Sequence, residues 1–196
     1  MLKDLIAKTR SYRRFYQDQA VSPVDLRELV DLARLSPSGA NLQPLKYILC
    51  CDPLMNEKIF PLLGWAGYLP DWPGPAEGER PSAYIILLND STVRPQAGCD
   101  HGIAAMSIML GTSEKGLGGC IIASVEKAKL SQLLGIAEQY EVLLVLALGK
   151  PKETVVIDPV GSEGDIKYWR DDESVHHVPK RSLDDLILNT YGGEKT

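Results

Sequence analysis

The segment from Gln96 to Lys115 is apolar on almost every face of the helix that it is expected to form. Small residues stand between large apolar ones, namely Gly98, Gly102, Ala104, Ala105, Ser107 and Gly111 between Ile103, Met106, Ile108, Met109 and Leu110. A helix without a polar face has to be buried, either at the centre of a domain or in a subunit interface. Its small residues would let two helix backbones approach closely, which favours an interface.

Apolar strand-like runs and helical patterns alternate along the rest of the chain. Strands are expected at Leu45–Cys51, Ala83–Leu88, Cys120–Ala123 and Val142–Leu148. Helices are expected at the N-terminus, after Ser22-Pro23, around Asn56–Leu63, over Val125–Leu134 and from near Ser182. Ser22 is a good N-cap, and Pro23 suits the first helical position. Three or four strands among several helices predict a single α+β or mixed α/β domain.

Two segments are expected to be irregular. Gly64–Pro81 contains two of the three tryptophans among prolines and glycines, so it cannot continue a helix or a central strand. Trp65, Tyr68 and Trp72 either cover a ligand or pack against the domain's own core, and the sequence leaves both open. Glu153–Val178 has little hydrophobic periodicity, and long segments of this kind are usually functional or reach another subunit.

Composition excludes several classes of protein. The 196 residues carry a net charge of -5, which makes sequence-independent binding of nucleic acid a poor hypothesis. No apolar run approaches the roughly 20 residues that span a bilayer, and the N-terminus lacks a signal-peptide core. We therefore expect a cytoplasmic protein without membrane or nucleic-acid partners.

No recognisable set of catalytic side chains appears. The cysteines (Cys50, Cys51, Cys99 and Cys120) and the three histidines lack metal-site spacing, so we expect reduced core thiols and no metal. A P-loop, a G-x-S-x-G elbow and a recognisable pair of carboxylates are missing as well. If the chain is an enzyme, a cofactor is expected to carry its reaction.

The stretch Thr9-Arg10-Ser11-Tyr12-Arg13-Arg14-Phe15 places three arginines and a serine within five residues. Guanidinium groups bind phosphate through paired, charge-assisted hydrogen bonds. Lys180-Arg181 is a second basic pair near the other end of an otherwise acidic chain. These clusters predict a compact anion site drawn from both ends of the chain, with a solvated charge run as the alternative.

A second polar segment, Pro37-Ser38-Gly39-Ala40-Asn41-Leu42-Gln43-Pro44, is expected to be a rigid loop between a helix and a strand. Asn and Gln offer a donor and an acceptor on one group, which suits the edge of a heterocycle such as uracil or flavin. Ordinary turn chemistry also explains this composition. Gly116-Leu117-Gly118-Gly119 predicts a tight turn and is not a dinucleotide-binding fingerprint.

Taken in order, R-S-Y-R-R-F, P-S-G-A-N-L-Q-P, G-L-G-G-C-I-I-A-S and P-K-R make the chain resemble the FMN-dependent nitroreductase family over residues 2 to about 191. The resemblance implies an α+β nitroreductase-like fold with a central mixed sheet flanked by helices. It also implies an intertwined homodimer with two FMN sites at the interface. Residues 1–196 would form one FMN-binding domain, with 153–196 as a C-terminal extension that contacts the partner subunit.

Residue roles follow from the same resemblance. It assigns the FMN phosphate to Arg10, Ser11 and Arg13, completed by Lys180 and Arg181. The flavin ring would be contacted by Pro37, Ser38, Gly39 and Asn41 of the other subunit. Backbone amides at Ile122, Ala123 and Ser124 would lie beside flavin N5 and O4. Thr9 and Leu45 depart from the family motifs, in which arginine and tryptophan are common at these two positions.

The resemblance also implies an activity. NADH or NADPH would deliver a hydride to N5 of FMN, and a nitroaromatic, quinone or similar small acceptor would then be reduced, with no catalytic side chain required. The alternative is an FMN-binding storage, sensor or regulatory protein without efficient NAD(P)H turnover. The physiological acceptor and the choice of nicotinamide cannot be derived from the sequence.

Overall fold

The structure is a computed structural model of the chain and describes residues 1–192. The chain forms two compact units, Met1–Glu153 and a second that begins at Thr154. The first contains a five-stranded sheet in the order β1-β5-β3-β2, with β4 also paired to β5. Its strands are β1 (Phe15–Tyr16), β2 (Leu45–Cys50), β3 (Ala83–Asp90), β4 (Gly118–Ile122) and β5 (Tyr140–Pro151). These strand pairs are antiparallel, and a parallel bridge joins Ser11 to Gly119.

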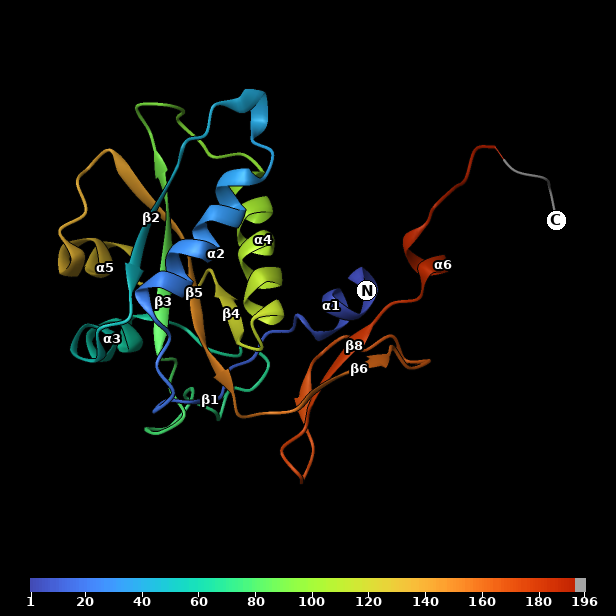
Figure 1. Cartoon of the computed structure of the whole chain (residues 1–196). Helices are drawn as coiled ribbons and strands as arrows, with labels where there is room; N and C mark the ends of the chain where they lie inside the picture. The colour runs from blue at the N-terminus through green and yellow to red at the C-terminus, as the bar shows by residue number, and fades with distance from the viewer. Residues whose placement is uncertain (193–196) are drawn as a thin grey trace. The chain divides into compact units, whose positions relative to one another are not determined.

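Helices cover both faces of this sheet (Figure 1). The helices of this unit are α1 (Leu2–Lys8), α2 (Pro23–Leu35), α3 (Pro53–Ile59), α4 (Asp100–Glu114) and α5 (Lys127–Leu134), with short 3₁₀ turns at Gly39–Asn41 and Phe60–Leu62. Helices α2 and α4 lie on one face, and α3 and α5 lie on the other. The unit is thus a three-layer α+β fold, as the sequence predicted.

The start of α2 shows how local sequence sets an element. The Ser22 hydroxyl accepts a hydrogen bond from the Asp25 amide at 3.0 Å, and Pro23 occupies the first helical position. Leu26, Leu29 and Ala33 then recur at helical spacing and are buried. Cap and apolar stripe agree, and the helix forms where the pattern predicted it.

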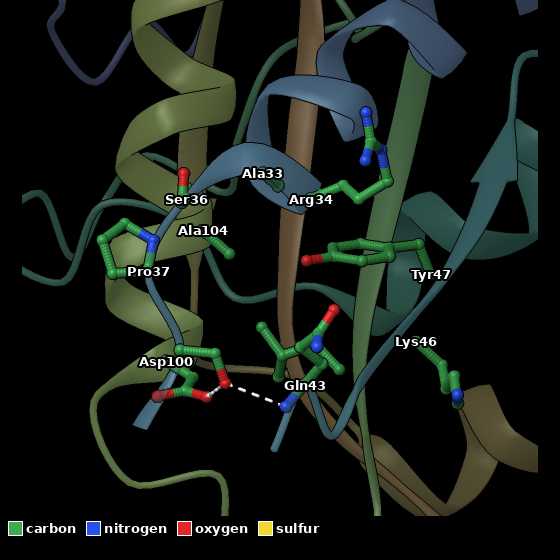
Figure 2. Close-up of a pocket in the computed structure, with 11 residues that line it drawn as sticks. Ala33, Arg34, Ser36, Pro37, Gln43, Lys46, Tyr47, Asp100 and Ala104 are labelled. Atoms are coloured by element: carbon green, nitrogen blue, oxygen red, sulfur yellow. Dashed lines mark hydrogen bonds between the residues drawn. The ribbon is translucent and has the colours of Figure 1, made fainter. Parts of the chain in front are cut away.

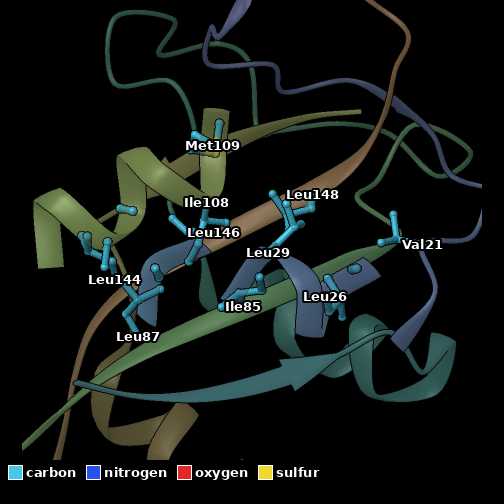
Figure 3. Packing of buried hydrophobic residues seen from close by; sticks show 14 residues of the cluster. Val21, Leu26, Leu29, Ile85, Leu87, Ile108, Met109, Leu144, Leu146 and Leu148 are labelled. Atoms are coloured by element: carbon cyan, nitrogen blue, oxygen red, sulfur yellow. The ribbon is translucent and has the colours of Figure 1, made fainter. Parts of the chain in front are cut away.

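Strand β3 is the centre of the core. All eight of its residues are buried, with alternate side chains on opposite faces of the sheet. Ile85 and Leu87 pack with α2 and α4 on one face, as Figure 3 shows, while Tyr84 and Ile86 belong to the cluster on the other face. Burying each large aliphatic side chain contributes about 1.5–3 kcal/mol. These contacts make the sheet a firm base for the loops at its ends.

Helix α4 is less buried than its composition predicted. One face packs on the sheet and on α2, and a Cβ at Gly111 would lie only 2.2 Å from Leu32 Cδ1. That small residue therefore allows close packing between two helices of the same chain. Ile103 and Met106 remain 38% and 37% exposed in the single chain. The expectation of burial on all sides is thus met on one side of the helix only.

The second unit contains regular structure that the sequence did not predict. A three-stranded sheet in the order β6-β8-β7 is built from β6 (Val155–Pro159), β7 (Trp169–Arg170) and β8 (His176–Lys180). Strands β6 and β8 are parallel. The short helix α6 (Leu183–Leu186) begins after Ser182, whose hydroxyl accepts from the Asp185 amide at 3.1 Å. This start was predicted.

Candidate functional site

The arginine-rich segment lies against β4. Ser11 forms a parallel bridge with Gly119, and the Tyr12 amide donates to the Gly119 carbonyl at 2.9 Å. A Cβ at Gly118 would lie 2.7 Å from the Tyr12 ring, and one at Gly119 would lie 2.8 Å from the Ala147 carbonyl oxygen. The glycines therefore allow the segment and β5 to approach β4 closely. Two sequence motifs separated by about a hundred residues are thereby neighbours.

The side chains of this segment offer hydrogen-bond donors. Arg10 donates through Nη2 to the Ile6 carbonyl at 2.6 Å, whereas its Nε is buried without a hydrogen-bond partner. Ser11 is exposed, and Arg13 Nη1 lies 3.4 Å from the Ser11 carbonyl oxygen. The Arg13 amide donates to the Glu153 carboxylate. A guanidinium donor that is buried and unpaired is what an anion ligand would satisfy.

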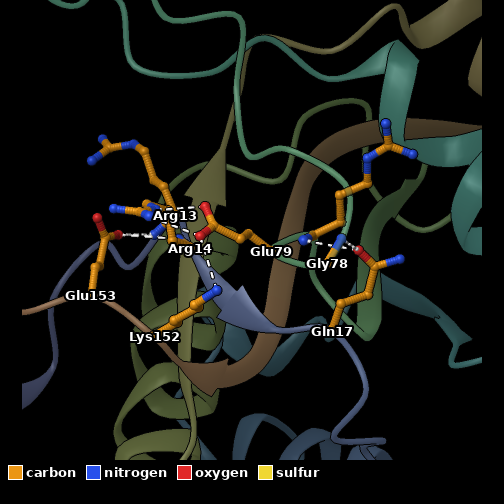
Figure 4. Close-up of polar contacts among 8 residues, drawn as sticks. Arg13, Arg14, Gln17, Gly78, Glu79, Lys152 and Glu153 are labelled. Carbon is orange, nitrogen blue, oxygen red and sulfur yellow. Dashed lines mark hydrogen bonds and ion pairs between the residues drawn. The ribbon is translucent and has the colours of Figure 1, made fainter.

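Arg14 has a different role from its neighbours (Figure 4). Its Nε and Nη2 donate to the two carboxylate oxygens of Glu79 at 2.6 and 2.7 Å, and Lys152 Nζ lies 3.1 Å from the same carboxylate. The hydrogen bond from Arg14, aided by Lys152 and opposed by burial, lowers the pKa of Glu79 to about 2. Arg14 therefore fixes the Gly64–Pro81 loop to the N-terminal segment.

The Pro37–Pro44 loop lies at the N-terminal end of α4. It borders a cavity of about 250 Å³ that is lined in part by Pro37, Ser38, Gln43, Leu45, Tyr47 and Asp100 (Figure 2). Ser38 Oγ donates to Asp100 at 2.6 Å, and the Gly39 amide donates to the same carboxylate at 3.0 Å. Burial and the charge of Asp100 raise the pKa of Tyr47 to about 12. Asn41 is exposed.

Within one chain, the two motifs are held at opposite ends of α4. Thr9 of the arginine segment is hydrogen bonded to Ser113, whereas Ser38 is hydrogen bonded to Asp100. Asp100 and Ser113 are thirteen positions apart along the helix, which corresponds to about 20 Å at 1.5 Å per residue. The two motifs of one chain are therefore well separated along the helix axis.

The end of β4 carries the third group of expected site residues. Ile122 is buried, while Ala123 and Ser124 are exposed. The Ser124 carbonyl accepts from the Gly64 amide at 2.7 Å, and Leu63 is bridged to Val125. Because Ala123 follows Gly119 by four residues along an extended segment, it lies about 13 Å further along. One strand thus runs from the arginine segment to these backbone amides.

Lys180 and Arg181 are exposed at the end of β8 in the second unit. Their relation to Arg10 stays a prediction, as do the ligand roles of the other site residues. Asp100 was not predicted at all: an isolated aspartate in a helical pattern does not reveal a hydrogen-bond partner some sixty residues away.

The model of the nitroreductase family matches residues 6–67 and 78–150 of this chain, which together include β1–β4, all but the last residue of β5, the arginine segment and the Pro37–Pro44 loop.

The chain belongs to the nitroreductase family.

Related proteins are similar to this chain in sequence or in structure. MhqN of Bacillus subtilis, provisionally named an NAD(P)H nitroreductase, is 23% identical over 189 residues that cover 76% of this chain and 87% of its own. A nitroreductase family protein from Streptococcus pneumoniae superposes with a TM-score of 0.70 at 18% identity, covering 97% of this chain and all of its own. An FMN-dependent nitroreductase from Clostridium difficile superposes with a TM-score of 0.62 at 23% identity, covering 76% of this chain and 87% of its own.

The two departures from the nitroreductase motifs have structural roles. The buried Thr9 hydroxyl donates to the Leu5 carbonyl at 2.7 Å and lies 2.9 Å from the Ser113 hydroxyl, so it fixes the end of α1 to α4. Leu45 lines the cavity beside the Pro37–Pro44 loop. Of the aromatic residues in the irregular loop, Trp65 packs within its own unit, 5.6 Å from the Phe60 ring, and Tyr68 is 48% exposed.

The cysteines are unpaired thiols, and Cys99 is exposed rather than in the core. Burial raises the pKa of the Cys120 thiol, against the opposing charge of Arg13 and a hydrogen bond with Ser11. Among residues 1–192, no cluster of three or more potential metal ligands is present. No helix in that part of the chain has the length and apolarity needed to cross a bilayer.

Proposed function

We propose that this chain is an FMN-dependent oxidoreductase that oxidises NADH or NADPH and reduces a nitroaromatic, quinone or similar small acceptor. The observation that carries the proposal is the position of the arginine segment beside β4, with a buried and unpaired Arg10 Nε. The names of the relatives support the two cofactors: MhqN is named for NAD(P)H, and the C. difficile protein is named for FMN.

The residues present fit the phosphate of FMN. Arg10 and Arg13 supply guanidinium donors and Ser11 an exposed hydroxyl, all within four residues of backbone held against β4. Arg14 is excluded from this role because Glu79 already occupies two of its donors. We further propose that Lys180 and Arg181 complete the phosphate pocket. Charge-assisted hydrogen bonds of this kind are the strong ones in phosphate recognition.

The flavin ring is assigned to the far end of β4. Amides at Ile122, Ala123 and Ser124 would donate to the polar edge of the ring, about 13 Å along the strand from Gly119. That spacing is on the scale of a ribityl chain plus part of a tricyclic ring. Bound FMN would supply the hydride-accepting and hydride-donating chemistry, while the protein would orient the ring and stabilise charge on it.

We propose a homodimer in which the Pro37–Pro44 loop of one subunit, with Pro37, Ser38, Gly39 and Asn41, completes the site of the other. In one chain the two motifs lie about 20 Å apart along α4, and we assign the loop at each site to the other subunit. Ile103 and Met106 supply exposed apolar surface for an interface. Strand β2 is an edge strand beside a groove of about 760 Å³. We propose that the segment beyond α6 of the second copy binds in this groove. In that segment Leu188 is 98% exposed and Tyr191 is 91% exposed.

The test of this proposal is an anaerobic titration of the FMN-loaded protein with each nicotinamide. Loss of the visible flavin absorption on addition of NADH or NADPH, and its return on addition of a quinone or nitroaromatic, is the expected result. Flavin that binds but is not bleached by either nicotinamide would indicate the storage or sensor alternative. Protein that does not bind FMN would contradict both.

A further inference from the structure

The Pro37–Pro44 loop has an unusual backbone. Three of its residues that are not glycine have positive φ: 50° at Ala40, 56° at Asn41 and 52° at Gln43. This left-handed region is unfavourable for residues with a Cβ, although Asn tolerates it better than most. Such a conformation persists only where the surrounding structure holds it, and clusters of such residues occur at ligand-binding loops.

A single carboxylate outside the loop provides much of that support. Asp100 Oδ2 accepts from the Ser38 hydroxyl at 2.6 Å, and Oδ1 accepts from the Gly39 amide at 3.0 Å. The Ser38 hydroxyl in turn accepts from the Gln43 amide at 2.9 Å (Figure 2). The chain of bonds runs from Asp100 through Ser38 to Gln43, and it spans all three left-handed residues.

The surroundings of Asp100 keep it ionised. The residue is 5% exposed, and burial by itself would raise its pKa. The hydrogen bonds from Ser38 and Gly39 and the charge of Arg94 outweigh burial, so the pKa is lowered. A Cβ at Gly39 would lie 3.0 Å from Arg94 Nη1 and 3.4 Å from Asp100 Oδ1. Glycine at this position lets the loop backbone, the carboxylate and the guanidinium come together.

A role confined to the helix does not explain these contacts. Asp100 is the first residue of α4, where a carboxylate favours the positive end of the helix. The Ser38 hydroxyl and the Gly39 amide, which donate to Asp100, nevertheless belong to the loop rather than to α4. The carboxylate of Asp100 thus holds the loop through both of these hydrogen bonds.

We infer that Asp100 is a positioning residue that holds the Pro37–Pro44 loop in the left-handed conformation in which Asn41 is presented to the flavin ring. This inference rests on the proposed function, because it needs a bound flavin as the object of the loop. Asp100 itself would not contact the flavin and would act only through Ser38 and Gly39.

The first arm of the test needs no flavin. Amide hydrogen exchange would be measured by mass spectrometry on peptides from residues 37–44 in the flavin-free protein. Asp100→Ala should accelerate exchange there by about tenfold or more, because opening the loop no longer breaks the bonds to the carboxylate. Asp52→Ala is the matched control. Asp52 also accepts a hydrogen bond from a backbone amide, that of Met55 at 2.8 Å, but it caps α3. Its effect should be confined to α3.

The second arm compares FMN with riboflavin, which has the same ring but no phosphate. Asp100→Ala should weaken the binding of both flavins by the same factor, about tenfold, which corresponds to roughly 1.4 kcal/mol. Arg10→Ala should weaken the binding of FMN far more than that of riboflavin. Asp52→Ala should leave the affinity for both flavins unchanged. Ser38→Ala and Asp100→Asn serve as milder variants if Asp100→Ala does not fold, and both should show the same pattern at smaller size.

The outcomes separate the two proposals. Unchanged exchange in residues 37–44 would show that Asp100 does not hold the loop. Faster exchange with unchanged affinity for both flavins would show that the loop conformation does not serve the ring. Either result overturns this inference and leaves the proposed function standing. A parent protein that binds neither flavin would overturn the proposed function, and this inference with it.

Discussion

The Thr9 hydroxyl lies 2.9 Å from the Ser113 hydroxyl, and this hydrogen bond fixes the arginine segment to the C-terminal end of α4. The Ser38–Asp100 bond fixes the other polar loop to the N-terminal end of the same helix. One helix therefore sets the spacing between two segments to which we assign opposite parts of a flavin. This rigid spacing is the basis for our prediction of a site shared between two subunits.

Arg10 and Arg14 should differ sharply on substitution. Arg10→Ala should weaken FMN binding by about 1.5–3 kcal/mol, the scale of a hydrogen bond to a charged group. Arg14→Ala should instead lower the free energy of unfolding, because Arg14 is paired with Glu79. Fluorescence titration with FMN and urea denaturation of each variant would measure the two effects. Equal FMN affinity in Arg10→Ala and the parent would remove Arg10 from the phosphate site.

Glu79 should make the fold sensitive to acid. Its pKa is lowered from an ordinary value of 4.5 to about 2, so its contribution to stability is present above pH 4.5 and is lost as pH falls toward 2. Glu79→Gln should cost about 1–3 kcal/mol at neutral pH. The penalty should shrink in urea denaturation performed below pH 4.5. A penalty that is independent of pH would show that packing, not charge, dominates at this position.

The Cys120 thiol should be unreactive despite its position beside the arginine segment. It is buried, and burial raises its pKa, which makes a thiol a poor nucleophile. Cys120→Ala should retain most NAD(P)H oxidation and lose about 1 kcal/mol of stability. Stopped-flow reduction and thermal denaturation would check both. A collapse of the reduction rate with FMN still bound would show that the thiol takes part.

His177 should titrate at an elevated pH in the second unit. Its Nδ1 lies 2.7 Å from Asp158, its Nε2 lies 3.3 Å from Asp171, and its ring stacks on Trp169 at 4.1 Å. The bond to Asp158, opposed by burial and aided by Asp171, raises the pKa of His177. Its contribution to stability is therefore present below pH 6.5 and is lost as pH rises through the folded-state pKa.

Tryptophan fluorescence would follow this titration, because Trp169 stacks directly on the imidazole. The parent should show a transition with a midpoint above 6.5, the ordinary value for histidine. His177→Gln supplies the baseline, since it keeps a polar side chain that does not titrate in this range. The same transition in both proteins would assign it to another group.

The parts of the fold that the sequence predicted are those fixed by local signals. The Ser22 cap and the stripe through Leu26 and Leu29 define α2 without help from distant residues. Long apolar runs such as Ala83–Leu88 predict central strands because only a core can bury them. Strands β6 and β8 escaped prediction because each is only partly buried, so their sequences lack the long apolar run that marks a central strand.

The candidate site shows the same limit. The arginine cluster was visible in sequence, but the pairing of Arg14 with Glu79, which lies in an irregular loop, was not. Likewise, the polar character of the Pro37–Pro44 loop was evident, whereas its support by Asp100 was not. Charge and composition can be read locally. The partner that commits a side chain to one role is set by the tertiary fold.

The most direct test of a shared flavin site is complementation between two binding-deficient variants. Arg10→Ala and Asn41→Ala would each be purified, mixed under subunit-exchange conditions and titrated with FMN. If each site takes Arg10 from one subunit and Asn41 from the other, every heterodimer should regain one site with the affinity of the parent. Light scattering should show a dimer before and after mixing. No recovery of tight binding after exchange, or a monomer with full flavin occupancy, would contradict the account.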